Sequence, residues 1–343
     1  MKGKRPIIGI TMGDPVGIGP EIIVSALEDP LLYEICKPLV LGDEAVMKRA
    51  IALKSGKLEI HRTEPPGKGH YFCGSIDLMP LSSLDAVVLC PGRPTKETGR
   101  AMINYITTGV DLAMAGEIEA IATCPITKTA MKLAGSPFHG HTELIADRTK
   151  TPKFAMMMAG DRLRVVLVTI HIPLCEVSRR LNRDEILTTI SLTSTALKNR
   201  FGIHQPKIAV AGLNPHGGED GMFGREEQDT ITPAVEMAKA QGIDVSGPFP
   251  PDTLFFNASN GKYDAVVCMY HDQGLIPFKM LHFSDGVNTT LGLPIIRTSV
   301  DHGTAYDIAW QGAADPSSLV SAIKMAATQA VNRRTFSSSH SKA

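Results

Sequence analysis

Short apolar runs that alternate with longer helix-like segments are the feature that most constrains the fold of this chain. The runs are predicted strands, at residues 7–11, 39–42, 86–90, 120–123, 154–158, 164–168, 208–211 and 265–269. Such alternation is typical of parallel or mixed sheets that helices cover on both faces. The sequence therefore predicts an α/β protein, and its 343 residues are enough for two domains of ordinary size.

The clearest helix prediction covers residues 183–200. Asn182 directly precedes the segment, and Glu185 lies three positions after Asn182, which is a capping-box pattern. Ile186, Ile190 and Leu197 share one helical face. A glycine at position 202 can end the helix in a left-handed conformation.

Charge and composition exclude several classes of protein. The 35 basic residues balance 35 acidic ones, so no overall field would attract nucleic acid or an anionic membrane. No apolar run has the length of a membrane span, and the first five residues lead into a strand rather than a signal-peptide core. Six cysteines are scattered without Cys-x-x-Cys spacing, and Cys90, Cys124 and Cys268 are predicted to be buried thiols. We expect a cytoplasmic protein, with a flexible tail at residues 333–343.

Three histidines each follow a predicted strand. His171 comes after the run at 164–168, His216 after 208–211, and His271 after 265–269. Sites in α/β proteins form beyond the carboxyl ends of strands. Three imidazoles brought together there would make a metal site with positions open to substrate, which is a catalytic pattern. The alternative is that each histidine is an ordinary polar residue at a strand end.

Nitrogen ligands and nearby carboxylates bear on the metal and on proton transfer. Ligation by imidazole alone favours Zn²⁺ or a similar transition metal. Mg²⁺ prefers oxygen ligands, which Asp252 and water could supply. Asp252 and Asp272 are also candidates for catalysis, because a carboxylate near a metal can orient a ligand imidazole or take a proton.

Further polar residues follow His271 at even spacing. Lys279, Asn288 and Arg297 lie nine residues apart, and Arg297 comes directly after an apolar run. A cation is costly to bury unless an anion meets it, and this trio would suit a phosphate or a carboxylate. The alternative, a set of unrelated surface charges, fits Lys279 better than Arg297.

Three turns complete the set of candidate ligand-binding segments. His141 and Thr142, in Gly-His-Thr-Glu, would suit a polar substrate, although Thr142 could instead cap a helix. The glycine-rich turn at residues 11–21 is either a tight structural turn or an anion-binding loop, and its spacing is not that of a Rossmann fold. The turn at residues 123–128 is a candidate cofactor or inter-domain loop.

Five strings in the sequence occur together in one family of enzymes. They are Gly-Asp-Pro-x-Gly-Ile-Gly-Pro-Glu, Gly-His-Thr-Glu, Gly-Leu-Asn-Pro-His-x-Gly-Glu, Tyr-His-Asp-Gln-Gly and Arg-Thr-Ser-x-Asp-His-Gly-Thr-Ala. The chain resembles the 4-hydroxythreonine-4-phosphate dehydrogenase family of pyridoxal phosphate biosynthesis from about residue 7 to about residue 330. It departs from the family pattern at His139 and Gly217.

The resemblance implies a fold like that of isocitrate and isopropylmalate dehydrogenases. Two α/β/α domains would enclose an active-site cleft, and the enzyme would be a homodimer. On this fold we expect a first domain at residues 1–132 and about 300–332. The second domain, at about 133–299, would carry the metal-ligand histidines.

The resemblance also implies roles for particular residues. The metal ligands would be His171, His216 and His271, and His271 would reach the site of the partner subunit. The substrate contacts would be His141, Thr142, Lys279, Asn288 and Arg297. The cofactors would be NAD or NADP and a divalent metal, zinc before magnesium or cobalt. No cofactor-binding residue can be named.

The reaction implied by the resemblance is oxidation of 4-hydroxy-L-threonine 4-phosphate at C3. The product, 2-amino-3-oxo-4-phosphooxybutanoate, then loses CO₂ to give 3-amino-2-oxopropyl phosphate. A paralogue would instead oxidise 4-phospho-D-threonate or 4-phospho-D-erythronate in sugar-acid catabolism. The residues alone also allow a three-histidine zinc hydrolase, which would need no nucleotide, or a metal or phosphate sensor without catalytic activity.

Overall fold

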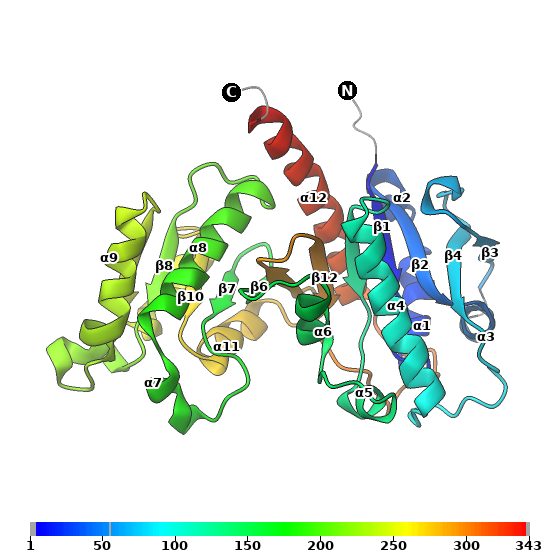
Figure 1. Ribbon diagram of the computed structural model, residues 1–343, viewed down its shortest axis with the longest axis horizontal. Coiled ribbons are helices and arrows are strands. Elements are labelled where there is room, and N and C mark those ends of the chain that lie inside the picture. The colour runs from blue at the N-terminus through cyan, green and yellow to red at the C-terminus, as the bar shows by residue number, and fades with distance from the viewer. Residues whose placement is uncertain (1–4, 55, 341–343) are drawn as a thin grey trace. The chain divides into compact units, whose positions relative to one another are not determined.

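The computed structural model describes residues 5–54 and 56–340, which form two compact α/β units (Figure 1). Unit 1 contains the chain up to Pro152 and Leu293–Val331, and unit 2 contains Lys153–Gly292 and the chain from Asn332 onward. These boundaries differ from the predicted ones near residues 132 and 300. Residues 133–152 and 293–299, and with them His141 and Arg297, belong to unit 1 rather than to the second domain.

Unit 1 contains a parallel sheet in the order β3-β4-β2-β1-β5-β12. Its strands are β1 (Ile7–Thr11), β2 (Lys37–Asp43), β3 (Glu59–Arg62), β4 (Ser75–Ser82), β5 (Ala120–Thr123) and β12 (Ile296–Val300). Its helices are α1 (Gly19–Ala26), α2 (Pro30–Ile35), α3 (Glu44–Leu53), α4 (Lys96–Met114), α5 (Lys128–Leu133), α6 (His141–Arg148) and the first part of α12 (Ser317–His340). A short 3-10 turn occupies Pro66–Lys68.

The two-residue period of the strands divides the core of unit 1 between the two faces of its sheet. Ile8 and Ile10 of β1 belong to a buried cluster that also contains residues of α1, α3 and α12. Helix α4 covers the opposite face, where Gly109 comes so close that an added Cβ would lie 3.0 Å from Leu41 and 3.4 Å from Thr11. Helices therefore cover both faces, as the alternating pattern predicts.

Unit 2 contains a mixed sheet in the order β11-β6-β7-β10-β8-β9. Its strands are β6 (Ala155–Ala159), β7 (Arg164–Leu167), β8 (Ile208–Ala211), β9 (Val245–Phe249), β10 (Ala265–Cys268) and β11 (Val287–Leu291). Strands β7, β10, β8 and β9 are parallel, whereas β6 runs antiparallel to β7 and to β11.

Helices also cover both faces of the sheet in unit 2. They are α7 (Val177–Arg180), α8 (Arg183–Asn199), α9 (Thr232–Ala240), α10 (Pro251–Ser259) and α11 (His271–Leu281), with 3-10 segments at Leu174–Glu176 and Pro215–Gly221 and a π-helical turn at Glu227–Ile231. Leu254 of α10 and Phe278 of α11 pack on one face with alternate residues of β7, β8 and β10. Helix α8 contacts the same strands and buries Ile186, Ile190 and Leu197.

Three predictions about local structure are wrong. Residues 86–90 form an exposed turn rather than a strand, with Val87 and Val88 91% and 70% exposed, and Cys90 is exposed rather than buried. The predicted flexible tail is helical, because α12 continues to His340, and residues 341–343 lie outside the described part. Serine hydroxyls in this stretch donate to carbonyls of the preceding turn, as Ser337 does to Arg333, which satisfies them within a helix.

The described part of the chain contains no helix that is long and apolar enough to cross a membrane.

Candidate functional site

The three histidines follow three neighbouring parallel strands of unit 2. Strand β10 lies between β7 and β8 and pairs with both, so the carboxyl ends of the three strands form one edge. His171 lies four residues after β7, His271 opens α11 three residues after β10, and His216 lies five residues after β8. Their predicted position just past three strands is therefore confirmed, and the structure adds that these strands are neighbours.

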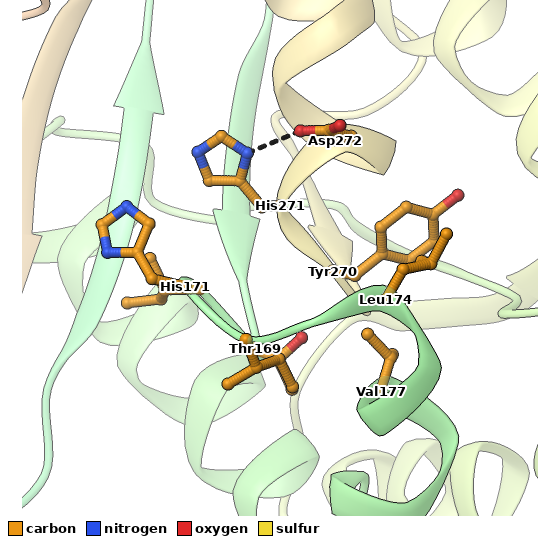
Figure 2. Close-up of a pocket in the computed structure, with 9 residues that line it drawn as sticks. Thr169, His171, Leu174, Val177, Tyr270, His271 and Asp272 are labelled. Atoms are coloured by element: carbon orange, nitrogen blue, oxygen red, sulfur yellow. Dashed lines mark hydrogen bonds and ion pairs between the residues drawn. The ribbon is translucent and has the colours of Figure 1, made fainter.

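Two of these histidines face one another at a pocket of about 430 Å³. The ring centroids of His171 and His271 are 5.6 Å apart, with their planes inclined by 42°. Figure 2 shows both rings beside the pocket, and Nδ1 of His271 lies 2.7 Å from Oδ1 of Asp272. Since this contact occupies Nδ1, metal ligation by His271 would use Nε2. The other lining residues are Thr169, Ile170, Ile172, Leu174, Val177 and Tyr270.

His216 lies on a loop of unusual backbone conformation. The φ angles of His216, Glu219 and Asp220 are 56°, 44° and 54°, in the left-handed region that favours glycine. Nδ1 of His216 lies 3.1 Å from Oε1 of Glu219, and 66% of the histidine side chain is exposed. The loop thus presents this imidazole to solvent.

The structure brings together the imidazoles of two of the three predicted metal ligands. Within residues 5–54 and 56–340, no three His, Cys, Asp or Glu side chains are gathered closely enough to hold a metal ion. The facing imidazoles of His171 and His271 nevertheless supply the donor type that Zn²⁺ and related metals prefer. These donors fit a transition metal, and the roles of His171, His216 and His271 as its ligands, with His271 reaching the site of the partner subunit, stay predictions.

A buried cation in unit 1 marks a second candidate site. Arg297 on β12 is only 3% exposed, and its Nε and Nη2 donate to the Thr123 hydroxyl over 3.2 and 3.0 Å. Burial lowers the pKa of Arg297 to about 10, which still leaves the guanidinium charged at neutral pH. The alternative that Arg297 is an unrelated surface charge is therefore wrong, and its contact with substrate stays a prediction.

His141 lies close to this guanidinium, at the start of α6. It is 8% exposed, and burial together with the charge of Arg297 holds its pKa well below the usual value, so the imidazole is neutral. Its Nε2 is buried without a hydrogen-bond partner among the described residues. An unsatisfied imidazole nitrogen beside a buried cation can accommodate an anionic group that carries a hydroxyl.

The other predicted substrate and catalytic residues are distributed over both units. Thr142 is the second residue of α6, whose N-cap is Gly140, so the alternative that Thr142 caps the helix is wrong. In unit 2, Lys279 lies on α11 with Nζ 5.5 Å from the centre of the Phe283 ring, and Asn288 lies on β11 opposite Met158. The predicted catalytic residues Asp272 and Asp252 occupy the first turns of α11 and α10, and both are exposed.

Thr123 begins the turn at residues 123–128 that the sequence marks as a candidate cofactor or inter-domain loop, but local patterns do not predict its contact with Arg297. Its hydroxyl is fully buried and holds the guanidinium of Arg297, which lies 174 residues away in the chain. A threonine at the end of an apolar strand has no pattern that predicts this contact. The only signal was the buried arginine itself, which requires an acceptor somewhere in the fold.

The glycine-rich turn of residues 11–21 packs against the turn of residues 123–128. The Asp14 amide donates to the carbonyl of Pro125 over 3.0 Å, and the Tyr306 hydroxyl donates to Oδ2 of Asp14 over 2.6 Å. Asp14 is buried, and this burial raises its pKa. These contacts support the reading of residues 11–21 as a tight structural turn.

Comparison with known proteins identifies the family. The family model of the pyridoxal phosphate biosynthetic protein PdxA matches residues 34–326. The chain belongs to this family. A 4-hydroxythreonine-4-phosphate dehydrogenase from Desulforapulum autotrophicum is 77% identical over 330 residues, which are 96% of this chain and 97% of that protein.

Two further comparisons bear on fold and substrate. A solved structure of 4-hydroxythreonine-4-phosphate dehydrogenase from Klebsiella pneumoniae has a TM-score of 0.88 and 42% identity, covering 95% of this chain and 98% of that one. A D-threonate 4-phosphate dehydrogenase from Pectobacterium atrosepticum is 46% identical over 321 residues, covering 93% of this chain and 98% of the relative. The family therefore includes proteins named for two different phosphorylated substrates.

Proposed function

We propose that this PdxA-family protein oxidises 4-hydroxy-L-threonine 4-phosphate at C3, with NAD⁺ or NADP⁺ as the acceptor. The observation that carries the proposal is the buried Arg297 guanidinium beside the unsatisfied Nε2 of His141. This pair suits an anionic substrate that also carries hydroxyl groups. The choice of the amino-acid phosphate follows the relative that is 77% identical, against 46% for the threonate enzyme.

The proposed substrate residues act by charge and by hydrogen bonding. Thr123 holds the guanidinium of Arg297 in one orientation, so that a substrate anion meets a preformed cation. His141 is neutral, and Nε2 can therefore donate or accept, according to its tautomer. Thr142, Lys279 and Asn288 are proposed to contact the remaining polar groups of the substrate.

We propose that His171, His216 and His271 bind a divalent metal, with Zn²⁺ before Co²⁺ or Mg²⁺. When bound, such an ion acts as a Lewis acid toward substrate oxygen atoms. The contact with Asp272 fixes the ring of His271 and its tautomer, which is how carboxylates commonly support ligand histidines. This contact favours positioning over proton transfer as the role of Asp272.

Proton transfer and hydride transfer complete the proposed reaction. Asp252 lies in the first turn of α10 and is exposed, so it can exchange protons with water, and we propose it as the candidate base. A nicotinamide cofactor, when bound, would supply the acceptor for the hydride that leaves C3. The resulting β-keto acid loses CO₂ because its ketone accepts the electrons of the breaking bond. The product is 3-amino-2-oxopropyl phosphate.

We propose in addition that the protein is a cytoplasmic homodimer. Ile276, Met280 and Phe283 lie at helical spacing on and just after α11 and are 59%, 82% and 80% exposed. An exposed apolar stripe of this kind is typical of an interface between protein chains. Because His271 opens the same helix, a second copy bound there would lie close to the histidine pair. The scattered free cysteines support a reducing compartment.

The alternative function is oxidation of 4-phospho-D-threonate or 4-phospho-D-erythronate. The 46% identity to a D-threonate 4-phosphate dehydrogenase favours this candidate over other chemistries. Both functions use the same anion site and the same oxidation. They differ in the group at C2 of the substrate, which is an amine in one and a hydroxyl in the other.

The deciding experiment measures NAD(P)H formation with each of the three substrates, with Zn²⁺ and with chelator. We expect the highest kcat/KM for 4-hydroxy-L-threonine 4-phosphate and loss of activity in chelator. A preference for a sugar-acid phosphate would establish the alternative. Activity that needs no nucleotide would indicate a hydrolase, and binding without turnover would indicate a sensor.

Substitution of two buried arginines by lysine tests the anion site itself. We expect Arg297→Lys to lower kcat/KM at least about 100-fold, because lysine cannot reproduce the fork of donors. Arg200→Lys is the matched control, since Arg200 is 6% exposed in unit 2 and donates to the Thr290 carbonyl. Equal losses in both variants would show that Arg297 only stabilises the fold.

A further inference from the structure

The three histidine loops extend beyond the last backbone pairs of their strands. The ladder between β7 and β10 ends at Leu167 and Cys268, and the ladder between β10 and β8 ends at Val267 and Val210. Backbone groups buried past such an end need other partners. In unit 2, buried side chains supply several of these partners.

We propose that Thr169, Gln273 and Glu227 are positioning residues that hold the three histidine loops in register for metal binding. The inference rests on the proposed metal site and extends it to residues that do not touch the metal. Each of the three side chains bonds to backbone within four residues of one of the histidines.

Thr169 joins the first loop to the second. Its amide and its hydroxyl both donate to the Met269 carbonyl, over 3.2 and 2.7 Å, and the residue is 8% exposed. Thr169 lies two residues before His171, and Met269 lies two residues before His271. A shift of either loop would break one or both bonds, so the separation of the two imidazoles depends on this contact.

Gln273 joins the second loop to the third. Its Oε1 accepts from the Met269 amide over 2.7 Å, and its Nε2 donates to the Gly212 carbonyl over 2.6 Å. The residue is 7% exposed, and Gly212 lies four residues before His216. The side-chain amide of glutamine carries both an acceptor and a donor, and Gln273 uses both. An ionised glutamate at this position would offer acceptors alone and could not donate to the Gly212 carbonyl.

Glu227 holds the first residues of the third loop. It is 4% exposed, and its Oε1 accepts from the amides of Leu213 and Asn214, each over 2.7 Å. Its Oε2 accepts from Nδ2 of Asn214 over 2.9 Å. Glu227 opens a π-helical turn, an irregularity that is frequent at functional sites.

The loop held in this way is conformationally strained. The backbone from His216 to Asp220 has positive φ throughout, although three of these residues are not glycine. Such conformations persist only where surrounding contacts impose them. Glu227 and Gln273 contact the backbone of Gly212, Leu213 and Asn214, and these contacts fix the point from which His216 extends.

Cobalt binding by the purified protein tests the inference without relying on turnover. Co²⁺ is titrated into metal-free protein, and its visible absorption reports both the Kd and the ligand geometry. We expect Gln273→Glu to raise the Kd about 10–100-fold and to change the band intensity, as loss of groups that orient metal ligands does. Thr169→Val removes the hydroxyl but keeps the hydrogen bond from the backbone amide of residue 169 to the Met269 carbonyl. It should therefore have a smaller effect in the same direction.

Two matched variants separate positioning from general stability. Thr193→Val in α8 removes a fully buried hydroxyl that donates to the Thr189 carbonyl over 2.7 Å, and it should leave the Kd for Co²⁺ unchanged. Glu227→Gln keeps an acceptor for the two amides and should bind Co²⁺ more tightly than Glu227→Met does. Thermal unfolding by circular dichroism measures the stability of every variant.

His271→Ala distinguishes failure of this inference from failure of the metal site. If His271→Ala binds Co²⁺ as tightly as the wild type does, both proposals are overturned. If it binds weakly while Gln273→Glu and Glu227→Met bind normally, the metal site stands and the positioning role is overturned. Should Gln273→Glu fail to fold, the comparison of Thr169→Val with Thr193→Val decides, and equal Kd values would reject the inference.

Discussion

Substitution of Thr123 by valine tests how the buried guanidinium is held. The change keeps the shape of the side chain but removes the oxygen that accepts from Nε and Nη2 of Arg297. A hydrogen bond to a charged group contributes about 1.5 kcal/mol or more, so loss of two should lower the free energy of unfolding by about 3 kcal/mol. For a unit of this size, the melting temperature should fall by roughly 6–12 °C.

Thr298 provides the matched control on the neighbouring strand. It is also fully buried, but its hydroxyl donates over 2.9 Å to the Ala322 carbonyl, which is a neutral group. Thr298→Val should therefore cost about 1 kcal/mol. Differential scanning calorimetry at constant ionic strength measures both variants.

Inorganic phosphate makes the test specific for an anion site. If Arg297 binds substrate phosphate or carboxylate, added phosphate supplies the acceptor that Thr123→Val lacks. The melting temperature of this variant should then rise more than that of the wild type or of Thr298→Val. Equal rises in all three proteins, or none, would refute the argument that the guanidinium is available to an anion.

Three further predictions concern metal content and pH. His171→Ala should lose bound metal and activity together, measured by elemental analysis and NAD(P)H formation, and full activity with full metal content would remove His171 from the site. Asp14→Asn should raise the free energy of unfolding at neutral pH. Burial raises the folded pKa of Asp14 above 3.8, so stability is lost as the pH rises through that folded pKa. Denaturant titration should show the gain shrinking in acid, and an equal gain at pH 4 and pH 8 would contradict this reasoning. His141→Gln should weaken the loss of stability below about pH 6.5. The folded pKa of His141 lies well below that value, so the unfolded chain takes up the proton first. An unchanged pH profile of unfolding would show that His141 is not buried in this way.

Several elements follow from local sequence signals alone. The strands at 7–11, 120–123 and 208–211 have the predicted bounds, because each is a buried apolar run with polar or turn residues around it. Helix α8 begins after Asn182, whose side chain accepts from the Glu185 amide over 2.9 Å, and Gly202 has a φ of 71°. These signals act between residues close in the chain, where one side chain suffices to start or end an element.

Other elements were missed because their sequences lack such signals. Strand β3 reads Glu-Ile-His-Arg and lies at the edge of its sheet. An edge strand can pair with its one neighbour while burying few apolar side chains, so its sequence carries no apolar run. Conversely, the apolar run at 86–90 is exposed, although its composition favours a strand. Burial depends on what the rest of the fold places against a segment, and local composition does not contain that information.

The sequence by itself determined the α/β class, the family, and the histidines and arginine of the candidate sites. Only the tertiary structure decided how they are arranged. It placed β10 between β7 and β8, so that His271 rather than His216 faces His171. It also joined Arg297 to Thr123 across 174 residues and Gln273 to Gly212 across 61. The physical reason is that a site needs groups within hydrogen-bond distance. Strand order and register, which act over the whole sheet, decide which distant segments come that close.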